Sequence, residues 1–251
     1  MQSIKDSLKS FFRNFPYILL LILLISLPVS LIQACIVDVR FEQSGIFEMK
    51  EDMSGALSKY MIYNLLSILL TSILTMLHIG VMLLRKCNFD GTPVNFRAIF
   101  EKSMVLLPRV WLPQILSGII VGIGLIFFLL PGILLYYIFY MVPYAVVYTE
   151  EWGRRGLYVA SRYPRKHGRK VVGMILFYFI YSIVLVAGTS LLMNLIPFTG
   201  KVYYILSAGV YCLQDLLSCI PVMIIGGFAL SLPIELNNSA QSNEKGSQES
   251  V

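Results

Sequence analysis

The sequence predicts an all-α, polytopic membrane protein with six transmembrane helices, and three observations support this fold class. The chain of 251 residues is 57% hydrophobic and only 14% charged, whereas about a quarter of the residues of a soluble domain are charged. Its apolar residues gather in runs of about 20, the length at which a helix crosses the hydrocarbon core of a bilayer. Its basic residues gather between alternate runs.

Six apolar runs are the predicted spans: 17–37, 61–84, 110–130, 133–149, 171–196 and 203–232. We expect Pro131 and Gly132 to form a tight turn between the third and fourth spans. Pro143 should kink the fourth span, because proline removes a backbone donor and clashes with the preceding helical turn. Residues 1–236 are therefore predicted to form one transmembrane domain. The polar segment 237–251 has no apolar periodicity and is predicted to be a disordered tail.

The distribution of Lys and Arg predicts the orientation of the spans. The N-terminal segment, residues 85–109, residues 150–170 and the tail together carry 16 of the 20 basic residues, and the alternate segments carry 4. Residues 38–59, in the alternate set, also carry five acidic side chains. Because Lys and Arg are enriched in the short cytoplasmic flanks of spans, both chain ends are expected in the cytoplasm.

Three segments with helical spacing of apolar and basic residues stand before the odd-numbered spans. Such amphipathic helices lie in the headgroup layer of a membrane. The first combines Ile4, Leu8, Phe11, Phe12 and Phe15 with Lys5, Lys9 and Arg13, the second Phe96, Ile99, Phe100 and Met104 with Arg97 and Lys102, and the third Leu157 and Ala160 with Arg154, Arg155 and Arg162.

The densest basic cluster of the chain lies just before the fifth span. We predict that it contacts anionic phospholipid headgroups, since each basic residue near such a surface contributes about 1 kcal/mol. The alternative is that the cluster only sets the topology. Nucleic-acid binding is disfavoured because the cluster adjoins a membrane span. Its members are Arg154, Arg155, Arg162, Arg165, Lys166, Arg169 and Lys170.

Two ionisable residues lie inside predicted spans. Asp215, next to Gln214, is near the middle of the sixth span, and His78 is in the second. An intramembrane ionisable residue indicates a proton or substrate contact, with helix-to-helix hydrogen bonding as the alternative. A direct pair between Asp215 and His78 is disfavoured, because their expected depths differ by about 10 Å at the helical rise.

Tyrosines recur at every fourth residue along the fourth span, and Tyr140 and Tyr144 complete the candidate intramembrane polar site with Asp215, Gln214 and His78. A stripe of this kind could line a polar path through the membrane. The alternative is ordinary packing, because tyrosine is also favoured between helices and at membrane interfaces.

No motif in the sequence indicates catalysis. There is no phosphate-binding glycine loop that ends in Lys-Ser or Lys-Thr, no HExxH, and no group of His, Cys and carboxylates at metal-ligand spacing. No nucleophile stands near a base. We therefore predict a protein that is not an enzyme, with no catalytic residue, metal site or cofactor.

Several stretches resemble one known family. They are Ser10-Phe11-Phe12-Arg13-Asn14, Ser44-Gly45-Ile46-Phe47-Glu48, Leu130-Pro131-Gly132-Ile133, Pro143-Tyr144-Ala145-Val146-Val147 and Ala160-Ser161-Arg162. In this order, over residues 1–236, the chain resembles the YciC-like inner-membrane proteins of bacteria, a family without an established activity. That family is related to the membrane domain of some glycerophosphodiester phosphodiesterases. The resemblance implies a multi-pass protein of the bacterial inner membrane and no catalytic residues. Pro164 and the position of Gly168 depart from the family pattern.

Two functional hypotheses follow. The leading one is a non-enzymatic membrane protein that organises lipid or a partner membrane protein, with anionic phospholipid headgroups as the expected ligands. The alternative is a small transporter or permease subunit that uses the intramembrane Asp215.

Overall fold

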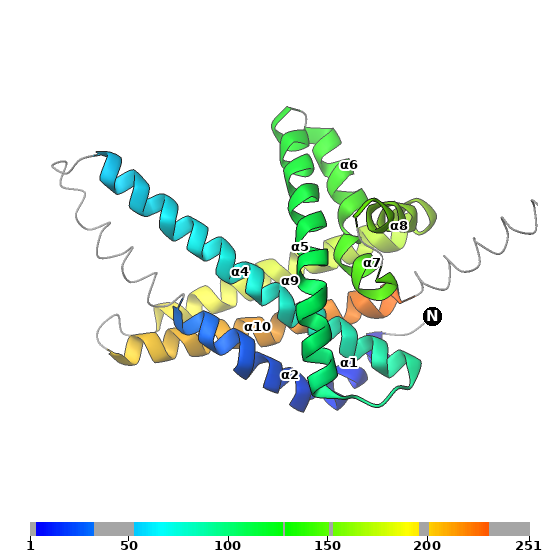
Figure 1. Cartoon of the computed structure of the whole chain (residues 1–251), viewed down its shortest axis with the longest axis horizontal. Coiled ribbons are helices and arrows are strands. Elements are labelled where there is room, and N and C mark those ends of the chain that lie inside the picture. The colour runs from blue at the N-terminus through cyan, green and yellow to red at the C-terminus, as the bar shows by residue number, and fades with distance from the viewer. Residues whose placement is uncertain (1–3, 33–52, 128, 151–152, 196–200, 231–251) are drawn as a thin grey trace, which may run out of the picture. The chain divides into compact units, whose positions relative to one another are not determined.

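The computed structural model describes residues 4–32, 53–127, 129–150, 153–195 and 201–230. These residues form helices and no strand, which confirms the predicted all-α class (Figure 1). The predicted tail, 237–251, lies outside the described residues. In chain order the helices are α1 (Ile4–Arg13), α2 (Phe15–Leu21), the π-helix η1 (Ile22–Ser26), α4 (Met53–Asp90), α5 (Phe96–Phe127), α6 (Leu129–Phe139), α7 (Val142–Thr149), α8 (Gly153–Lys166), α9 (Gly168–Asn194) and α10 (Lys201–Ala229).

Five helical stretches of the described chain are long and apolar enough to cross a membrane. They are Phe15–Ile32, Phe96–Phe127, Gly132–Thr149, Gly168–Asn194 and Val202–Ala229. They overlap five of the six predicted spans, and Phe96–Phe127 begins 14 residues before the predicted span 110–130. The remaining predicted span, 61–84, lies within the 38-residue helix α4, and many of its side chains are outside the described set. The protein is therefore a polytopic membrane protein.

The chain divides into two compact units. The first comprises Met1–Asn14, Ile79–Tyr181 and Ile220–Val251, and the second comprises Phe15–His78 and Ser182–Cys219. The described parts of three segments predicted to face the cytoplasm, 4–14, 85–109 and 153–170, fall in the first unit. The connection between α5 and α6, predicted to lie on the other side, falls in the first unit as well.

The reversal between the third and fourth spans does not lie where the sequence predicted it. α5 ends at Phe127 and α6 begins at Leu129, so Pro131 and Gly132 belong to the first turn of α6. Proline is tolerated there because its missing N–H would have no helical partner. A Cβ on Gly132 would lie 2.6 Å from the backbone nitrogen of Leu125, so glycine permits close contact between α5 and α6.

The predicted kink at Pro143 is confirmed. α6 ends at Phe139 and α7 begins at Val142, with Pro143 in its first turn. The three predicted amphipathic segments have different outcomes. α1 and α8 are separate helices, whereas the second segment forms the start of α5 and continues through Pro108 and Pro113 into the third span. Prolines inside membrane helices are tolerated where other groups satisfy the freed backbone.

Candidate functional site

The basic helix α8 presents two arginines on its exposed side. Val159 and Ala160 are buried, while Arg155 and Arg162 are exposed. The guanidinium carbon of Arg162 lies 4.8 Å from the centre of the Tyr158 ring, a distance typical of a cation–π contact. Tyr158 is itself 57% exposed. This surface therefore combines positive charge with an aromatic ring, as headgroup-binding helices do.

The start of α9 continues this basic surface. Arg169 and Lys170 are exposed, and the next residue, Val171, is buried. The chain bends at His167 between α8 and α9, and the hydroxyl of Tyr137 on α6 donates a hydrogen bond of 2.8 Å to the carbonyl of Pro164. Four of the seven predicted lipid contacts are thus exposed. The side chains of Arg154, Arg165 and Lys166 lie outside the described set.

The N-terminal helix α1 buries one residue of the apolar face that the sequence predicted for the headgroup layer. Its buried positions are Ser7, Ser10 and Phe11, whereas Ile4 is 54% and Phe12 is 70% exposed. Phe11 had been predicted to lie on the lipid side together with Ile4 and Phe12. The prediction was wrong for Phe11. Ser7 and Ser10 are small enough to allow close packing of α1, and the Phe11 side chain, next to Ser10, is buried with them.

Asn88, in the last turn of α4, holds α1 in place. Its side-chain amide donates a hydrogen bond of 2.8 Å to the Ser10 hydroxyl. The guanidinium of Arg13 donates to the Asn88 side-chain oxygen, and the amide of Asn14 donates to the Ser10 carbonyl at 2.9 Å. This clamp was not predicted, since neutral amides and hydroxyls far apart in sequence leave no local signal.

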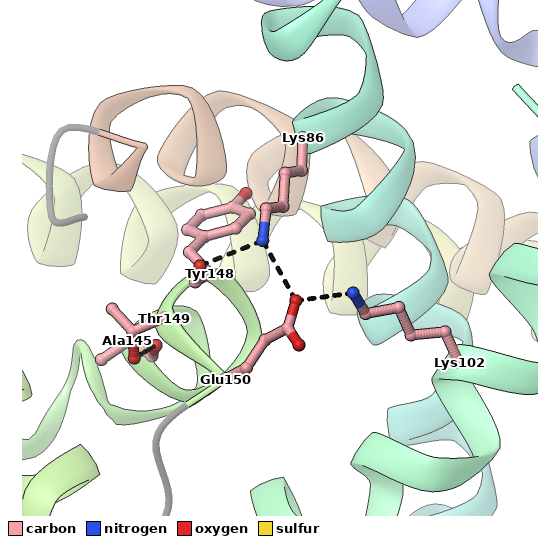
Figure 2. A network of polar contacts seen from close by, with 6 residues as sticks. All are labelled: Lys86, Lys102, Ala145, Tyr148, Thr149 and Glu150. Atoms are coloured by element: carbon pink, nitrogen blue, oxygen red, sulfur yellow. Dashed lines mark hydrogen bonds and ion pairs between the residues drawn. The ribbon is translucent and has the colours of Figure 1, made fainter. Parts of the chain in front are cut away.

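Glu150 joins three segments of the first unit, as Figure 2 shows. Its carboxylate oxygen Oε1 accepts a hydrogen bond of 2.6 Å from Lys102 Nζ on α5 and one of 3.3 Å from Lys86 Nζ on α4. The Lys86 ammonium also donates to the Tyr148 carbonyl at 3.2 Å. The hydrogen bond from Lys102 holds the pKa of Glu150 below its ordinary value, against the opposing effect of desolvation.

Glu150 also has an unusual backbone. Its φ is 60°, in the left-handed region, where it ends α7 with its N–H bonded to the Val146 carbonyl. Non-glycine residues adopt this region at a cost. The two lysines that bind the carboxylate therefore also stabilise the turn that leads toward α8.

Two neighbouring glycines of α10 admit polar side chains into the interior of the first unit. A Cβ on Gly226 would lie 2.4 Å from the Tyr148 hydroxyl oxygen, and one on Gly227 would lie 2.8 Å from Ser7 Oγ and 3.1 Å from an Arg85 guanidinium nitrogen. Arg85 is only 3% exposed. Desolvation lowers its pKa, while the charge of Asp6 opposes that effect.

The predicted tyrosine stripe lies in the first unit. Exposure falls along it, from 43% at Tyr136 to 5% at Tyr144 and 2% at Tyr148. The Tyr140 ring lies 5.9 Å from Tyr136 and 6.3 Å from Tyr178 on α9, centre to centre. The ring of Tyr140 thus packs against tyrosines of α6 and α9. The buried hydroxyls of Tyr140 and Tyr148 have no hydrogen-bond partner within the described chain.

Asp215 belongs to the second unit, where it meets the π-helix η1. The Ser26 hydroxyl, at the last position of η1, donates a hydrogen bond of 2.5 Å to Asp215 Oδ2. The same hydroxyl lies 3.6 Å from Cys212 Sγ. Gln214 is half-buried.

His78 also reaches α10, one helical turn beyond Asp215. Its Nε2 lies 3.1 Å from Ser218 Oγ, and the Ser218 hydroxyl donates to the main-chain carbonyl of Asp215 at 2.7 Å. Among the described residues Asp215 and His78 form no direct pair, as predicted. Each of these two polar groups instead joins a neighbouring helix to α10.

The residues of the predicted intramembrane site are distributed over both units. Asp215, Gln214 and His78 lie in the second unit, and Tyr140 and Tyr144 lie in the first. No group of three or more His, Cys, Asp or Glu residues with metal-binding geometry occurs in the described ranges. No protein-family model, curated protein or solved structure matches the chain.

Proposed function

We propose that this chain is a multi-pass protein of the bacterial inner membrane whose basic cytoplasmic surface binds anionic phospholipid headgroups. In this proposal it organises lipid, or a partner membrane protein, and catalyses no reaction. The observation that carries the proposal is the exposed basic surface of α8 and the start of α9, formed by Arg155, Arg162, Arg169 and Lys170. Its assignment to the YciC-like family stays a prediction.

The expected strength of this interaction follows from the number of charges. Each basic side chain near an anionic surface contributes about 1 kcal/mol. Four such side chains therefore contribute about 4 kcal/mol. Without screening by salt, this corresponds to a preference of about a thousandfold for an anionic over an uncharged lipid surface. Salt reduces this value, because exposed charges interact over a Debye length of about 10 Å at moderate ionic strength.

The cytoplasmic orientation is supported by the way the basic flanks are grouped. The contacts of Asn88 with α1 and of Glu150 with Lys86 and Lys102 join three of these flanks within the first unit. Lys and Arg retained on one side of a membrane protein mark the cytoplasm. The inner leaflet, which carries anionic lipid, would then face the basic surface.

Native mass spectrometry of the delipidated full-length protein, titrated with phosphatidylglycerol or phosphatidylethanolamine of equal chain length, tests this proposal. We expect the wild type to retain more of the anionic lipid. The variant R155Q/R162Q/R169Q/K170Q should lose that preference.

The matched control removes the same number of charges from segments predicted to face the other side, as R40Q/K50Q/K59Q/K201Q. It should keep the preference for phosphatidylglycerol. Equal retention of both lipids by the wild type, or equal losses in the two variants, would contradict headgroup binding by the basic surface.

The second candidate function is a small transporter or permease subunit, and the contact between Ser26 and Asp215 favours it. Charged residues inside spans commonly mark ion or proton pathways. In proteoliposomes that contain a trapped pH-sensitive dye, an imposed pH gradient should collapse faster with the wild type than with Asp215→Asn. Equal rates for the two proteins, or a rate equal to that of empty vesicles, would oppose proton-coupled transport.

A further inference from the structure

We propose that Asp215 is an exchangeable-proton site within the membrane, and that the Ser26 hydroxyl accommodates both of its protonation states. This inference goes beyond lipid binding by the basic surface. It stands whether or not the chain carries a solute, because it concerns only the binding and release of one proton at the carboxyl group.

The Ser26 hydroxyl has one hydrogen and two acceptors within reach. Asp215 Oδ2 lies 2.5 Å from Ser26 Oγ, and Cys212 Sγ lies 3.6 Å from it. When the carboxylate is ionised, the serine hydrogen points to Oδ2. When a proton adds to Oδ2, the new O–H donates to Ser26 Oγ and the serine hydrogen turns toward Cys212 Sγ. Thiol sulfur is a weak acceptor. With Cys212 Sγ available, the Ser26 hydroxyl nevertheless has an acceptor both when Asp215 is ionised and when it is protonated.

The surroundings favour the neutral form without forbidding the charged one. A charge in the hydrocarbon region costs several kcal/mol unless it is paired or hydrated. Within the described ranges Asp215 forms no ion pair with Lys or Arg. One hydrogen bond from a serine offsets part of the cost of the ionised form. The carboxyl group is therefore placed where its proton can leave and return.

The nearby titratable groups are Cys212 and Cys219 on α10 and His78 on α4. Cys219 Sγ lies 3.2 Å from the Asp215 main-chain carbonyl, and His78 is hydrogen-bonded to Ser218. Cys219 thus contacts a main-chain carbonyl and His78 contacts a serine hydroxyl, and neither of the two makes a hydrogen bond to the Asp215 carboxyl. The exchangeable proton consequently belongs to Asp215 alone.

The π-helix supports a role other than simple packing. Ser26 ends η1, where the N–H of Leu27 bonds to the carbonyl of Ile22 instead of the usual residue four positions back. Single π-helical turns of this kind occur often at functional sites, because the extra residue shifts the positions that follow it. Here the shift falls next to Asp215, the only acidic residue of the candidate span Val202–Ala229.

Dicyclohexylcarbodiimide, an apolar reagent that modifies protonated carboxyl groups in hydrocarbon, tests the inference. We expect the full-length protein in lipid nanodiscs to take up one label at neutral pH, on a peptide that contains Asp215, and to take up less as the pH rises. Asp215→Asn should lose this label. Glu150→Gln, which removes a carboxyl outside the spans, should keep it.

Ser26→Ala sharpens the test. It removes both the donor to the ionised form and the acceptor of the neutral form's O–H, and the ionised form loses more because hydrogen bonds to charged groups are the stronger ones. Labelling should then persist to higher pH than in the wild type, whereas Cys212→Ala, which removes the acceptor used in the neutral state, should shift it to lower pH. An infrared C=O band of a protonated carboxyl, present in the wild type and absent from Asp215→Asn, checks the same point without a reagent. No label and no band at any pH would overturn the proposal, whatever the outcome of the lipid titration.

Discussion

The two units hold their helices together with different kinds of polar contact. The first has ion pairs, as in the binding of Lys86 and Lys102 to Glu150, in addition to neutral contacts such as that of Asn88 with Ser10. The second uses hydroxyl, carboxyl and imidazole groups inside apolar helices, as between Ser26 and Asp215 and between His78 and Ser218. Exposed charges are solvated and add little stability, whereas polar groups in hydrocarbon need a partner. Each unit therefore uses the chemistry that its surroundings permit.

The glycines of α10 show a related difference between the units, since Gly226 and Gly227 lie in the first unit and Gly209 lies in the second. A Cβ at Gly226, in the first unit, would lie 2.4 Å from the hydroxyl oxygen of the buried Tyr148, whereas one at Gly209, in the second, would meet nothing within 4 Å. The first position is a close-packed contact. The second is open to the surroundings.

The largest expected effect is that of Gly226→Ala. Overpacking against the buried Tyr148 ring should lower the free energy of unfolding by about 1–3 kcal/mol. Gly209→Ala should instead raise it by up to about 1 kcal/mol, because alanine favours the helix. Thermal unfolding of both variants in one detergent measures the difference, and equal shifts of the same sign would show that the two positions are packed alike.

A smaller effect is expected for Ser218→Ala in the second unit. It removes the hydrogen-bond partner of His78, and such bonds between membrane helices contribute about 0.6 kcal/mol on average and at most about 1.7 kcal/mol. Ser190→Ala, at an exposed position of α9, is the control and should leave the midpoint unchanged. A shift in the control as large as that of Ser218→Ala would mean that the contact with His78 adds nothing.

The smallest effect is expected for Glu150→Gln, which breaks two partly exposed ion pairs worth about 0–1 kcal/mol each. Because the folded-state pKa of Glu150 is lowered, its contribution should be complete at neutral pH and fade as the pH falls through that lowered value. Added salt should reduce it as well. Melting curves of wild type and variant should therefore converge in acid. A difference between the two melting curves that grows in acid would contradict the lowered pKa assigned to Glu150.

The spans and their flanks could be predicted from the sequence because both depend on composition alone. Runs of about 20 apolar residues and the placement of Lys and Arg carry that information locally. The exposed basic surface of α8 and the helix break near Pro143 could also be predicted, because each depends on residues that are close together in the sequence. Asp215 was identified as a candidate because a carboxyl group in an apolar run is rare.

Contacts between distant segments could not be predicted in the same way. The partner of Asp215 is Ser26, 189 residues away, and serine is too common in apolar runs to indicate a partner. The turn assigned to Pro131 and Gly132 failed for another reason: proline suits the first turn of a helix as well as a loop. The inward face of α1 depends on Ser7 and Ser10, whose small size matters only once another helix packs against them.

The most direct test of the central claim, that the basic flanks of the first unit lie together on the cytoplasmic side of the membrane, is a cysteine-labelling map. Single cysteines at Arg155, which is exposed, and at Lys201, in the segment predicted to face the other side, are introduced into a variant without native cysteines. An impermeant maleimide added to intact bacterial spheroplasts should label Lys201→Cys at once and Arg155→Cys only after permeabilisation. Labelling of Arg155→Cys in intact spheroplasts, with Lys201→Cys protected, would contradict the claim.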